Sequence, residues 1–254
     1  MADTKKYYRY IILIIATNNT QYFNNCRNVW KQYINLYPAL KVFFVYGKLN
    51  QPLEDRDSND IVYDDIIEHN RFTTIQKSLI AMKYISCNYT YDYLIKTNLS
   101  TFWNLNLVDS LLDKCPKEKC YAGGHDLSPF FISEPIYTTI YTKLYSGVCT
   151  IVTPDIVELF FKNLSKFSFT LPDDISLGLF MTDIECNTYT IDNRLYLENY
   201  SIVDKHIIEE EINKGIQNNF VYYRVKNDNN REHTDLMIYN YLLKTIYNIT
   251  EINN

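Results

Sequence analysis

The chain has 254 residues, 46% of them hydrophobic, and is therefore long and apolar enough to form a sizeable core. Its 25 basic and 30 acidic residues give a net charge of −5 without a cluster of Lys and Arg, which disfavours nucleic-acid binding. Six cysteines without a CxxC pair are typical neither of a zinc site nor of a disulfide scaffold. With 6 Gly, 7 Pro and no linker-like stretch, we expect a single domain over residues 1–254, with flexible ends at 1–8 and 250–254.

The first apolar run, Tyr10–Ala16, superficially looks like the core of a signal peptide. Polar residues Thr17–Thr20 follow it without a small-residue cleavage pattern, and the run is far shorter than the roughly 20 residues that span a bilayer. We interpret it as the first core strand. The sequence therefore predicts no transmembrane segment and a cytoplasmic location.

The apolar runs Ile11–Ala16 and Leu40–Tyr46 have the length of strands, and the segment between them, Asn24–Leu36, carries apolar residues at helical spacing. This β-α-β order indicates a parallel sheet. A helix over Thr73–Tyr84 then precedes a buried strand at Tyr93–Thr97. Ligands bind at the carboxyl ends of such strands, so we expect one rim of the sheet to carry the residues that follow them. These are Thr17, Gly47 and Asn98–Ser100.

The second half of the chain continues the alternation of strands and helices up to about Thr188, where the pattern weakens. The expected elements are a short helix at Leu105–Leu112, strands at Cys120–Gly124 and Tyr145–Thr153, helices from Thr153 and over Asp173–Met181, a strand at Phe220–Val225 and a helix at Asp235–Ile246. The sequence thus predicts an α/β fold with a mostly parallel central sheet flanked by helices.

Two polar motifs stand at the ends of these elements. The strand before Asn98 ends in the run Lys96–Phe102, in which Asn98 closes a turn in the simplest interpretation. The run Leu171–Gly178 contains two adjacent acids, Asp173 and Asp174, at the start of a predicted helix. An acid at that position either caps the helix or acts as a general base.

These motifs, together with Asp64-Asp65-Ile66-Ile67 and Tyr145-Ser146-Gly147, resemble the inverting β-1,3-galactosyltransferases and the Fringe-type glycosyltransferases. The corresponding patterns in those enzymes are Lys-Thr-Asp-Asp-Asp-x-Phe and Leu-Pro-Asp-Asp-x-x-x-Gly. The resemblance covers roughly residues 11–181. It implies a single Rossmann-like domain of the GT-A type that transfers a hexose from a UDP-sugar to a hydroxyl of a glycan or glycoprotein, with inversion.

The resemblance also assigns roles to individual residues. Asp174 corresponds to the general base, and Asp173 to a helix cap or acceptor contact, with Ser146 and Gly147 beside the bound sugar. The expected donor-binding residues are Thr17, Arg27, Lys77, Lys96, Asn98, Ser100, Arg224 and Lys226.

The acidic triplet that holds a divalent ion in those enzymes is replaced here by Asn98, Leu99 and Ser100. Hard cations prefer charged oxygen ligands, and this run offers only neutral ones, so we expect no metal cofactor or a weakly held Mn²⁺ or Mg²⁺. The leaving diphosphate still needs positive charge. The cations available for it are Arg224, Lys226, Arg231 and Lys77, although a solvated basic loop explains the first three equally well.

Two alternatives remain open at this stage. One is a non-catalytic relative that binds a nucleotide or a carbohydrate, since fold does not guarantee activity. The other is a metal-dependent enzyme that uses Asp64, Asp65 or Asp92. The four histidines, His69, His125, His206 and His233, are not expected to be ligands. The abundance of Asn, Ile, Lys and Tyr indicates an AT-rich genome, for which a large DNA virus is one source.

Overall fold

The computed structural model describes residues 5–49, 51–53, 55–68, 73–124, 126–133, 136–227 and 231–250. Its contacts divide the chain into two compact units, each made of three segments. Unit 1 comprises Met1–Ile15, Lys41–Asn98 and Cys115–Ile191, and unit 2 comprises Ala16–Leu40, Leu99–Lys114 and Asp192–Asn254. The expectation of a single domain stays a prediction.

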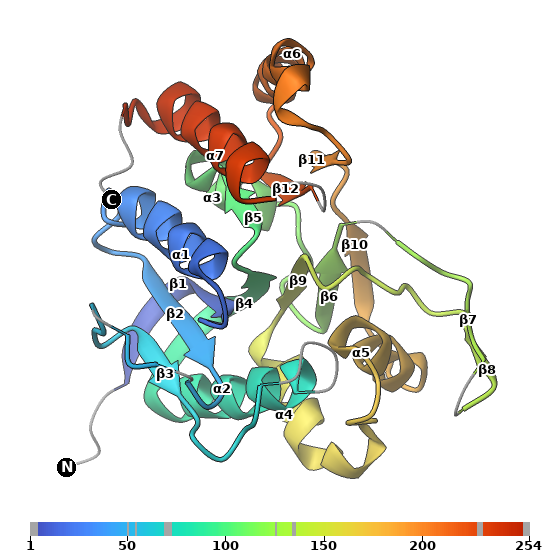
Figure 1. Ribbon diagram of the computed structural model, residues 1–254. Coiled ribbons are helices and arrows are strands. Elements are labelled where there is room, and N and C mark those ends of the chain that lie inside the picture. Colours follow the sequence, from blue (N-terminus) through green and yellow to red (C-terminus); the bar gives the residue numbers. More distant parts are fainter. Residues whose placement is uncertain are drawn as a thin grey trace. The chain divides into compact units, whose positions relative to one another are not determined.

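Unit 1 is built on a seven-stranded sheet with the order β10-β6-β9-β4-β1-β2-β3 (Figure 1). Every strand runs in the same direction except β9, which is antiparallel to both of its neighbours. The predicted α/β class with a mostly parallel central sheet is thus confirmed. The strands are β1 (Lys6–Ile15), β2 (Lys41–Tyr46), β3 (Asp60–Val62), β4 (Tyr89–Asn98), β6 (Cys120–Gly123), β9 (Cys149–Val152) and β10 (Asn187–Thr190).

The central strands of this sheet are buried on both faces, as their continuous apolar runs predict. Residues Ile11–Ile14 of β1 are fully buried. Ile15 lies in register with Val45 of β2 on one side and with Asn98 of β4 on the other. The carboxyl ends of these three strands therefore meet at one edge. The strand order also reverses between β1 and β4, which is where open α/β sheets bind their ligands.

Three helices cover one face of this sheet: α2 (Thr74–Asn88), α4 (Pro154–Lys162) and α5 (Asp173–Thr182) (Figure 1). Their apolar residues form the main core of unit 1 with side chains of β1, β2 and β4. Helix α4 begins as predicted, with Thr153 at the N-cap and Pro154 in the first turn. The aromatic rings of Phe167 and Phe180 stack at 4.4 Å and join the short turn η2 (Leu164–Lys166) to α5.

A two-stranded hairpin, β7 (Phe130–Ile132) and β8 (Thr138–Ile140), packs on α5 and was not predicted from the sequence. Its inner side chains, Ile132 and Ile140, are buried with Leu144. Gly178 of α5 permits this contact, because a Cβ atom at that position would lie 2.3 Å from Leu144 Cδ1.

Unit 2 contains a three-stranded sheet with the order β11-β12-β5, against which α6 and α7 pack. Helix α1 packs against α7. The strands are β5 (Thr101–Trp103), β11 (Arg194–Glu198) and β12 (Tyr222–Lys226). The helices are α1 (Gln21–Ile34), η1 (Leu105–Leu107), α3 (Val108–Leu112), η3 (Ile202–Asp204), α6 (Lys205–Gln217) and α7 (Arg231–Tyr247).

A buried carboxylate, Asp235 of α7, connects the parts of unit 2. It accepts hydrogen bonds from the Tyr22 hydroxyl at 2.7 Å and from the backbone and side-chain nitrogens of Asn227 at 3.1 and 2.8 Å. It also pairs with Arg231 at 3.0 Å. Each acceptor site of the carboxylate is thereby satisfied, which is what burial of a charge requires.

Several predicted boundaries were wrong. The strand expected at Tyr145–Thr153 begins only at Cys149, because Tyr145 forms an isolated bridge with Asp126 and a turn follows it. Helix α2 continues past Tyr84 to Asn88, and the weakly patterned region after Thr188 holds β11 and α6. Residues 6–8, expected to be flexible, pair with β4, whereas 1–4 and 251–254 lie outside the described residues.

Candidate functional site

Unit 1 buries two lysines, each beside a carboxylate. Lys96 of β4 is 1% exposed and forms an ion pair with Asp173, at the start of α5. Lys77 of α2 is 2% exposed, and its Nζ lies 2.7 and 2.8 Å from the two carboxylate oxygens of Glu68. Burial lowers the pKa of Lys77, while the Glu68 and Asp173 charges oppose this shift. Buried charges need such partners, because an unpaired one would cost several kcal/mol.

Gly147 connects the two aspartates of α5. Its backbone N–H donates to Asp174 Oδ2 at 3.3 Å, and its carbonyl accepts from Lys96 Nζ at 3.4 Å. A Cβ atom at Gly147 would lie 3.3 Å from Asp173 Oδ1, so the contact favours glycine. The structure thus brings together four predicted site residues, Lys96, Gly147, Asp173 and Asp174, and Ser146 precedes Gly147 in the chain. We call these four residues the aspartate cluster.

Asp174 differs from Asp173 in its electrostatic surroundings. Its Oδ1 accepts a hydrogen bond from Ile175 N at 2.9 Å, but it has no ion-pair partner of its own within the described part of the chain. Burial raises the pKa of Asp174, and the negative charge of Asp173 raises it further, against the opposing effects of Lys96 and the two backbone N–H groups. A carboxylate with a raised pKa accepts a proton more readily at neutral pH.

Glu68 was not predicted as a site residue. It contacts both Lys77 and the end of β2. The backbone N–H of Gly47 donates to Glu68 Oε1 at 2.6 Å. A Cβ atom at Gly47 would lie 2.5 Å from the carbonyl oxygen of Ile66, so only glycine fits there without a shift. Asp64 and Asp65, in the same acidic run, are exposed. Among the acids Asp64, Asp65 and Glu68, it is therefore Glu68 that contacts a predicted donor-binding residue, Lys77.

The turn that follows β4 belongs to unit 2 from Leu99 onward. The carbonyl of Leu99 accepts a hydrogen bond from Trp30 Nε1 at 3.1 Å, and the carbonyl of Ser100 accepts one from Val225 N at 3.0 Å. The guanidinium of Arg224 contacts the Ser100 hydroxyl, and its Nε lies 3.9 Å from Glu198. Burial lowers the pKa of Arg224. Ser100 and Arg224, both predicted donor-binding residues, are thus in contact.

These groups do not fit a divalent cation. The turn supplies no carboxylate, the carbonyls of Leu99 and Ser100 already accept hydrogen bonds, and a guanidinium sits at the Ser100 hydroxyl. Over the described ranges, no three His, Cys, Asp or Glu side chains form a group that could hold a metal ion. Asp92, considered as an alternative ligand, accepts a hydrogen bond from Tyr7 at 2.7 Å.

The remaining predicted donor-binding residues are Asn98 in unit 1 and Thr17, Arg27 and Lys226 in unit 2. Asn98 ends β4 and is partly buried, and Thr17 accepts a hydrogen bond from Asn19 N at 3.4 Å. Arg27 is buried in α1, and Lys226 is partly buried on β12. Arg231, a candidate phosphate contact, is held by Asp235; His206 and His233 are exposed, and His69 and His125 lie outside the described residues.

A cavity of about 780 Å³ in unit 2 lies along α6 and α7. Its lining includes Lys205, Glu209, His233 and Tyr241. None of the predicted site residues lines it, so it is not the predicted donor pocket.

Comparisons with known proteins support the fold. No family model matches the sequence, and no curated protein sequence matches it significantly. A glycosyltransferase involved in the glycosylation of the major capsid of PBCV-1 has a similar structure, with a TM-score of 0.50 and 10% identity over 92% of this chain and 98% of that one. The chain therefore shares the fold of a glycosyltransferase, as the resemblance implied.

Two further solved structures are less similar. The galactosyltransferase LgtC, solved with donor and acceptor sugar analogues, gives a TM-score of 0.43 at 8% identity, over 85% of this chain and 86% of that one. Mouse xyloside xylosyltransferase 1 gives a TM-score of 0.43 at 7% identity, over 86% of this chain and 97% of that one.

In the described ranges, no helix combines the length and the apolar character that a membrane crossing requires. The cytoplasmic location stays a prediction.

The raised pKa of Asp174 predicts how stability depends on pH. A carboxyl whose folded pKa exceeds its unfolded value contributes stability that is fully present below the unfolded pKa and is lost as the pH rises through the folded pKa. Asp174→Asn removes this contribution, so we expect the variant to gain stability relative to the parent between pH 3.5 and pH 7.5. Urea unfolding at both pH values measures the difference. The exposed change Asp64→Asn is the control; an equal difference at both pH values for Asp174→Asn would contradict the assignment.

Proposed function

We propose that the chain is a glycosyltransferase that transfers a hexose from a UDP-sugar to a hydroxyl group of a glycan or glycoprotein, with inversion. The observation that carries this proposal is Asp174, a carboxylate of raised pKa that Gly147 orients and that Lys96 does not neutralise, because Lys96 pairs with Asp173. The fold shared with the PBCV-1 capsid glycosyltransferase supports the same class of reaction.

In this proposal Asp174 acts as the general base. It removes the proton of the acceptor hydroxyl while that oxygen attacks the anomeric carbon of the donor. The bond from the anomeric carbon to the donor phosphate breaks on the opposite face, and UDP leaves with the electron pair. A single displacement of this kind inverts the anomeric centre. Asp173 and Lys96 act as positioning residues, since their ion pair holds the start of α5 beside Gly147.

We assign the cations of β12 to the donor diphosphate. Arg224 and Lys226 are two residues apart on this strand, so their side chains leave the same face of the sheet. Cationic groups strengthen contacts to phosphate, and the charge that develops on the leaving diphosphate is the main electrostatic demand of the transition state. In the proposal Arg224 and Lys226 supply the positive charge that a divalent cation would otherwise supply, because the residues after β4 do not fit such a cation.

A second candidate function is a binding protein of the same fold that takes up a nucleotide or a carbohydrate without transferring it. The observation that favours it is the replacement of an acidic triplet by Asn98, Leu99 and Ser100. Sugar transfer by the purified protein, measured across a panel of UDP-hexoses and acceptors, distinguishes the two. Donor binding without any transfer would favour the binding protein.

Asp174→Asn tests the base directly. We expect the rate of sugar transfer to fall about 100-fold or more, because proton removal occurs in the transition state, while the affinity for the donor changes little. Asp183→Asn, an exposed change beyond the other end of α5, is the matched control and should keep the parental rate. Transfer by Asp174→Asn at the parental rate would show that another group is the base.

Metal independence is tested by titrating UDP into the protein with and without EDTA. Because the residues after β4 offer only neutral oxygens and the Arg224 guanidinium contacts Ser100, we expect the affinity for UDP to change by less than about tenfold, which corresponds to roughly 1.4 kcal/mol. Isothermal calorimetry measures both affinities, and Mn²⁺ is then added back. A larger loss that Mn²⁺ restores would require a metal site elsewhere in the protein.

Arg224→Ala tests the diphosphate contact. We expect the affinity for UDP to fall about tenfold while the affinity for uridine is unchanged, because a charge-assisted contact to phosphate is worth about 1.5–3 kcal/mol. Arg194→Ala, which removes the same side chain from the neighbouring sheet strand β11, is the matched control. If Arg224→Ala weakened the binding of UDP and of uridine equally, Arg224 would stabilise the fold and would not contact the phosphate.

A further inference from the structure

Unit 1 contains a pair of buried thiols that the candidate site does not use, those of Cys115 and Cys120. Cys115 follows the turn after α3, and Cys120 is the first residue of β6. Both are free cysteines, and they are 3% and 0% exposed. Their side chains are hydrogen-bonded to each other, with Cys120 as the donor. An S–S bond is about 2.05 Å long, so two thiols already in contact need only a small rotation to form one.

The loop that joins the two cysteines is fixed to β4 at its first end. The Tyr93 hydroxyl donates to the carbonyls of Cys115 at 3.2 Å and of Pro116 at 3.1 Å. Lys117 Nζ lies 5.5 Å from the centroid of the Tyr93 ring. The hydrogen bond from Cys120 lowers the pKa of the Cys115 thiol against the opposing effect of burial, and the charge of Lys117 lowers it further. The thiolate is the form of cysteine that attacks an oxidant.

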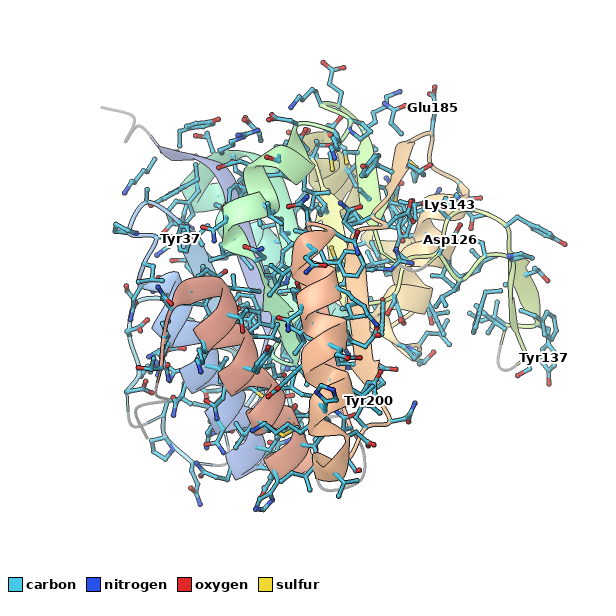
Figure 2. All side chains as sticks on the ribbon, turned by 90° about the horizontal axis from the view of Figure 1, so that it is seen from above. Tyr37, Asp126, Tyr137, Lys143, Glu185 and Tyr200 are labelled. Atoms are coloured by element: carbon cyan, nitrogen blue, oxygen red, sulfur yellow. The ribbon has the colours of Figure 1, made fainter. Side chains whose placement is uncertain are left out.

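The second end of the loop is fixed near the start of α4. The backbone N–H of Cys120 donates to Thr153 Oγ1 at 2.9 Å, and that of Lys119 donates to Asp155 Oδ2 at 2.7 Å. Lys119 Nζ also pairs at 3.1 Å with Glu185, which projects outward in Figure 2. Both ends of the loop are thus held by unit 1, and the two thiols stay together without a covalent bond. The loop is exposed at 117–119, which gives a small oxidant a short path to them.

Among the other cysteines, Cys186 is the rival partner of Cys120. It directly precedes β10, whose first residue lies in register with Cys120, and it acts on Cys120 electrostatically. Within the described residues, the Cys186 thiol shares no hydrogen bond with another cysteine. Cys87, on α2, is exposed and is a reference for an ordinary surface thiol. The contacts therefore favour Cys115 as the partner of Cys120.

We propose that Cys115 and Cys120 are a reversible redox pair that a hydroperoxide converts to an intramolecular disulfide. The Cys115 thiolate attacks one oxygen of hydrogen peroxide, the O–O bond breaks, and Cys115 becomes a sulfenic acid while hydroxide leaves and takes up a proton. The Cys120 sulfur then attacks the Cys115 sulfur, and the sulfenic hydroxyl leaves as water with the Cys120 proton. In total the two thiols lose two hydrogen atoms, and the peroxide is reduced to two water molecules. A dithiol reductant reverses the change.

The bridge joins the start of β6 to the residue at which the chain returns to unit 1, since the second segment of unit 2 ends at Lys114. Strand β6 lies between β10 and β9 in the sheet. A covalent link restricts the unfolded chain, whereas the folded loop already holds the two sulfurs together. We therefore expect the oxidised protein to resist unfolding better than the reduced one.

Peptide mapping of the whole protein tests the pair. The reduced protein is exposed to hydrogen peroxide under native conditions, free thiols are blocked with iodoacetamide, and the protein is digested with trypsin. Trypsin cleaves after Lys117 and Lys119, so the two cysteines fall on separate peptides, 115–117 and 120–143. We expect these peptides to be joined, with the loss of two hydrogen atoms, and to separate again after dithiothreitol. Joining of 120–143 to the peptide that holds Cys186 would overturn the pair.

Two serine variants assign the roles of the thiols. Cys120→Ser keeps a donor to the Cys115 sulfur but cannot form the bridge, so Cys115 should accumulate as a sulfenic acid that dimedone labels. Cys115→Ser should lose the fast reaction, with oxidation of Cys120 at least about tenfold slower, because Cys120 lacks a lowered pKa. Cys87→Ser is the matched control and should form the bridge at the parental rate. Equal dimedone labelling of Cys115 in the parent and in Cys120→Ser would overturn the role of Cys120.

Urea unfolding gives an independent measurement. Oxidation should raise the urea midpoint of the parent and leave the midpoints of Cys115→Ser and Cys120→Ser unchanged. A lower midpoint of the oxidised parent would show that the fold distorts to form the bridge, and consumption of Cys87 while Cys115 and Cys120 stay reduced would show that the pair is not reactive. Either result would overturn the proposal. None of these measurements uses sugar transfer, so their outcome is independent of the proposed function.

Discussion

The ion pair between Lys96 and Asp173 is the interaction on which the candidate site depends. Lys96 lies on the central strand β4 and is almost fully buried, so it requires a negative partner nearby. Asp173 supplies it from the first turn of α5, where a carboxylate is also favoured by the helix dipole. The next acid, Asp174, lies at the same helix end but forms no ion pair with Lys96, whose charge opposes the rise of the Asp174 pKa only in part. Its raised pKa follows from this unequal division of charge as well as from burial.

Lys77 and Glu68 form a second buried ion pair in unit 1, so both buried lysines of this unit are paired with a carboxylate. Glu68 binds the lysine of α2 through both oxygens and also receives the backbone N–H of Gly47 at the end of β2. The electrostatic effect of Asp173 on Lys77 links this pair to the first one. Two lysines therefore face three carboxylates. An excess of negative charge in a buried layer raises the proton affinity of the carboxylate that is least compensated.

The sequence predicted the central β-α-β arrangement because long apolar runs of strand length have few other interpretations. It also placed the start of α5, where Pro172 and two acids are a strong local signal. It did not predict that Lys96 pairs with Asp173, since nothing local to either residue specifies a partner distant in the chain. The hairpin was missed because its strands have three residues each. Helix α6 was missed although Ile208 and Ile212 are spaced as on one helix face, because charged residues surround them.

Asp235 has a consequence for the order in which the protein can be assembled during synthesis. Its hydrogen bond to Tyr22 joins residues that are 213 positions apart, and unit 2 takes its segments from three separate parts of the chain. Helix α1 leaves the ribosome long before α7 exists, so the Tyr22 hydroxyl must remain hydrated until translation reaches the C-terminal helix. Contacts of such long range form late and leave apolar surface exposed meanwhile. A nascent chain that stops before α7 lacks the carboxylate that joins α1 to the end of β12, and chaperones would meet it in that open form.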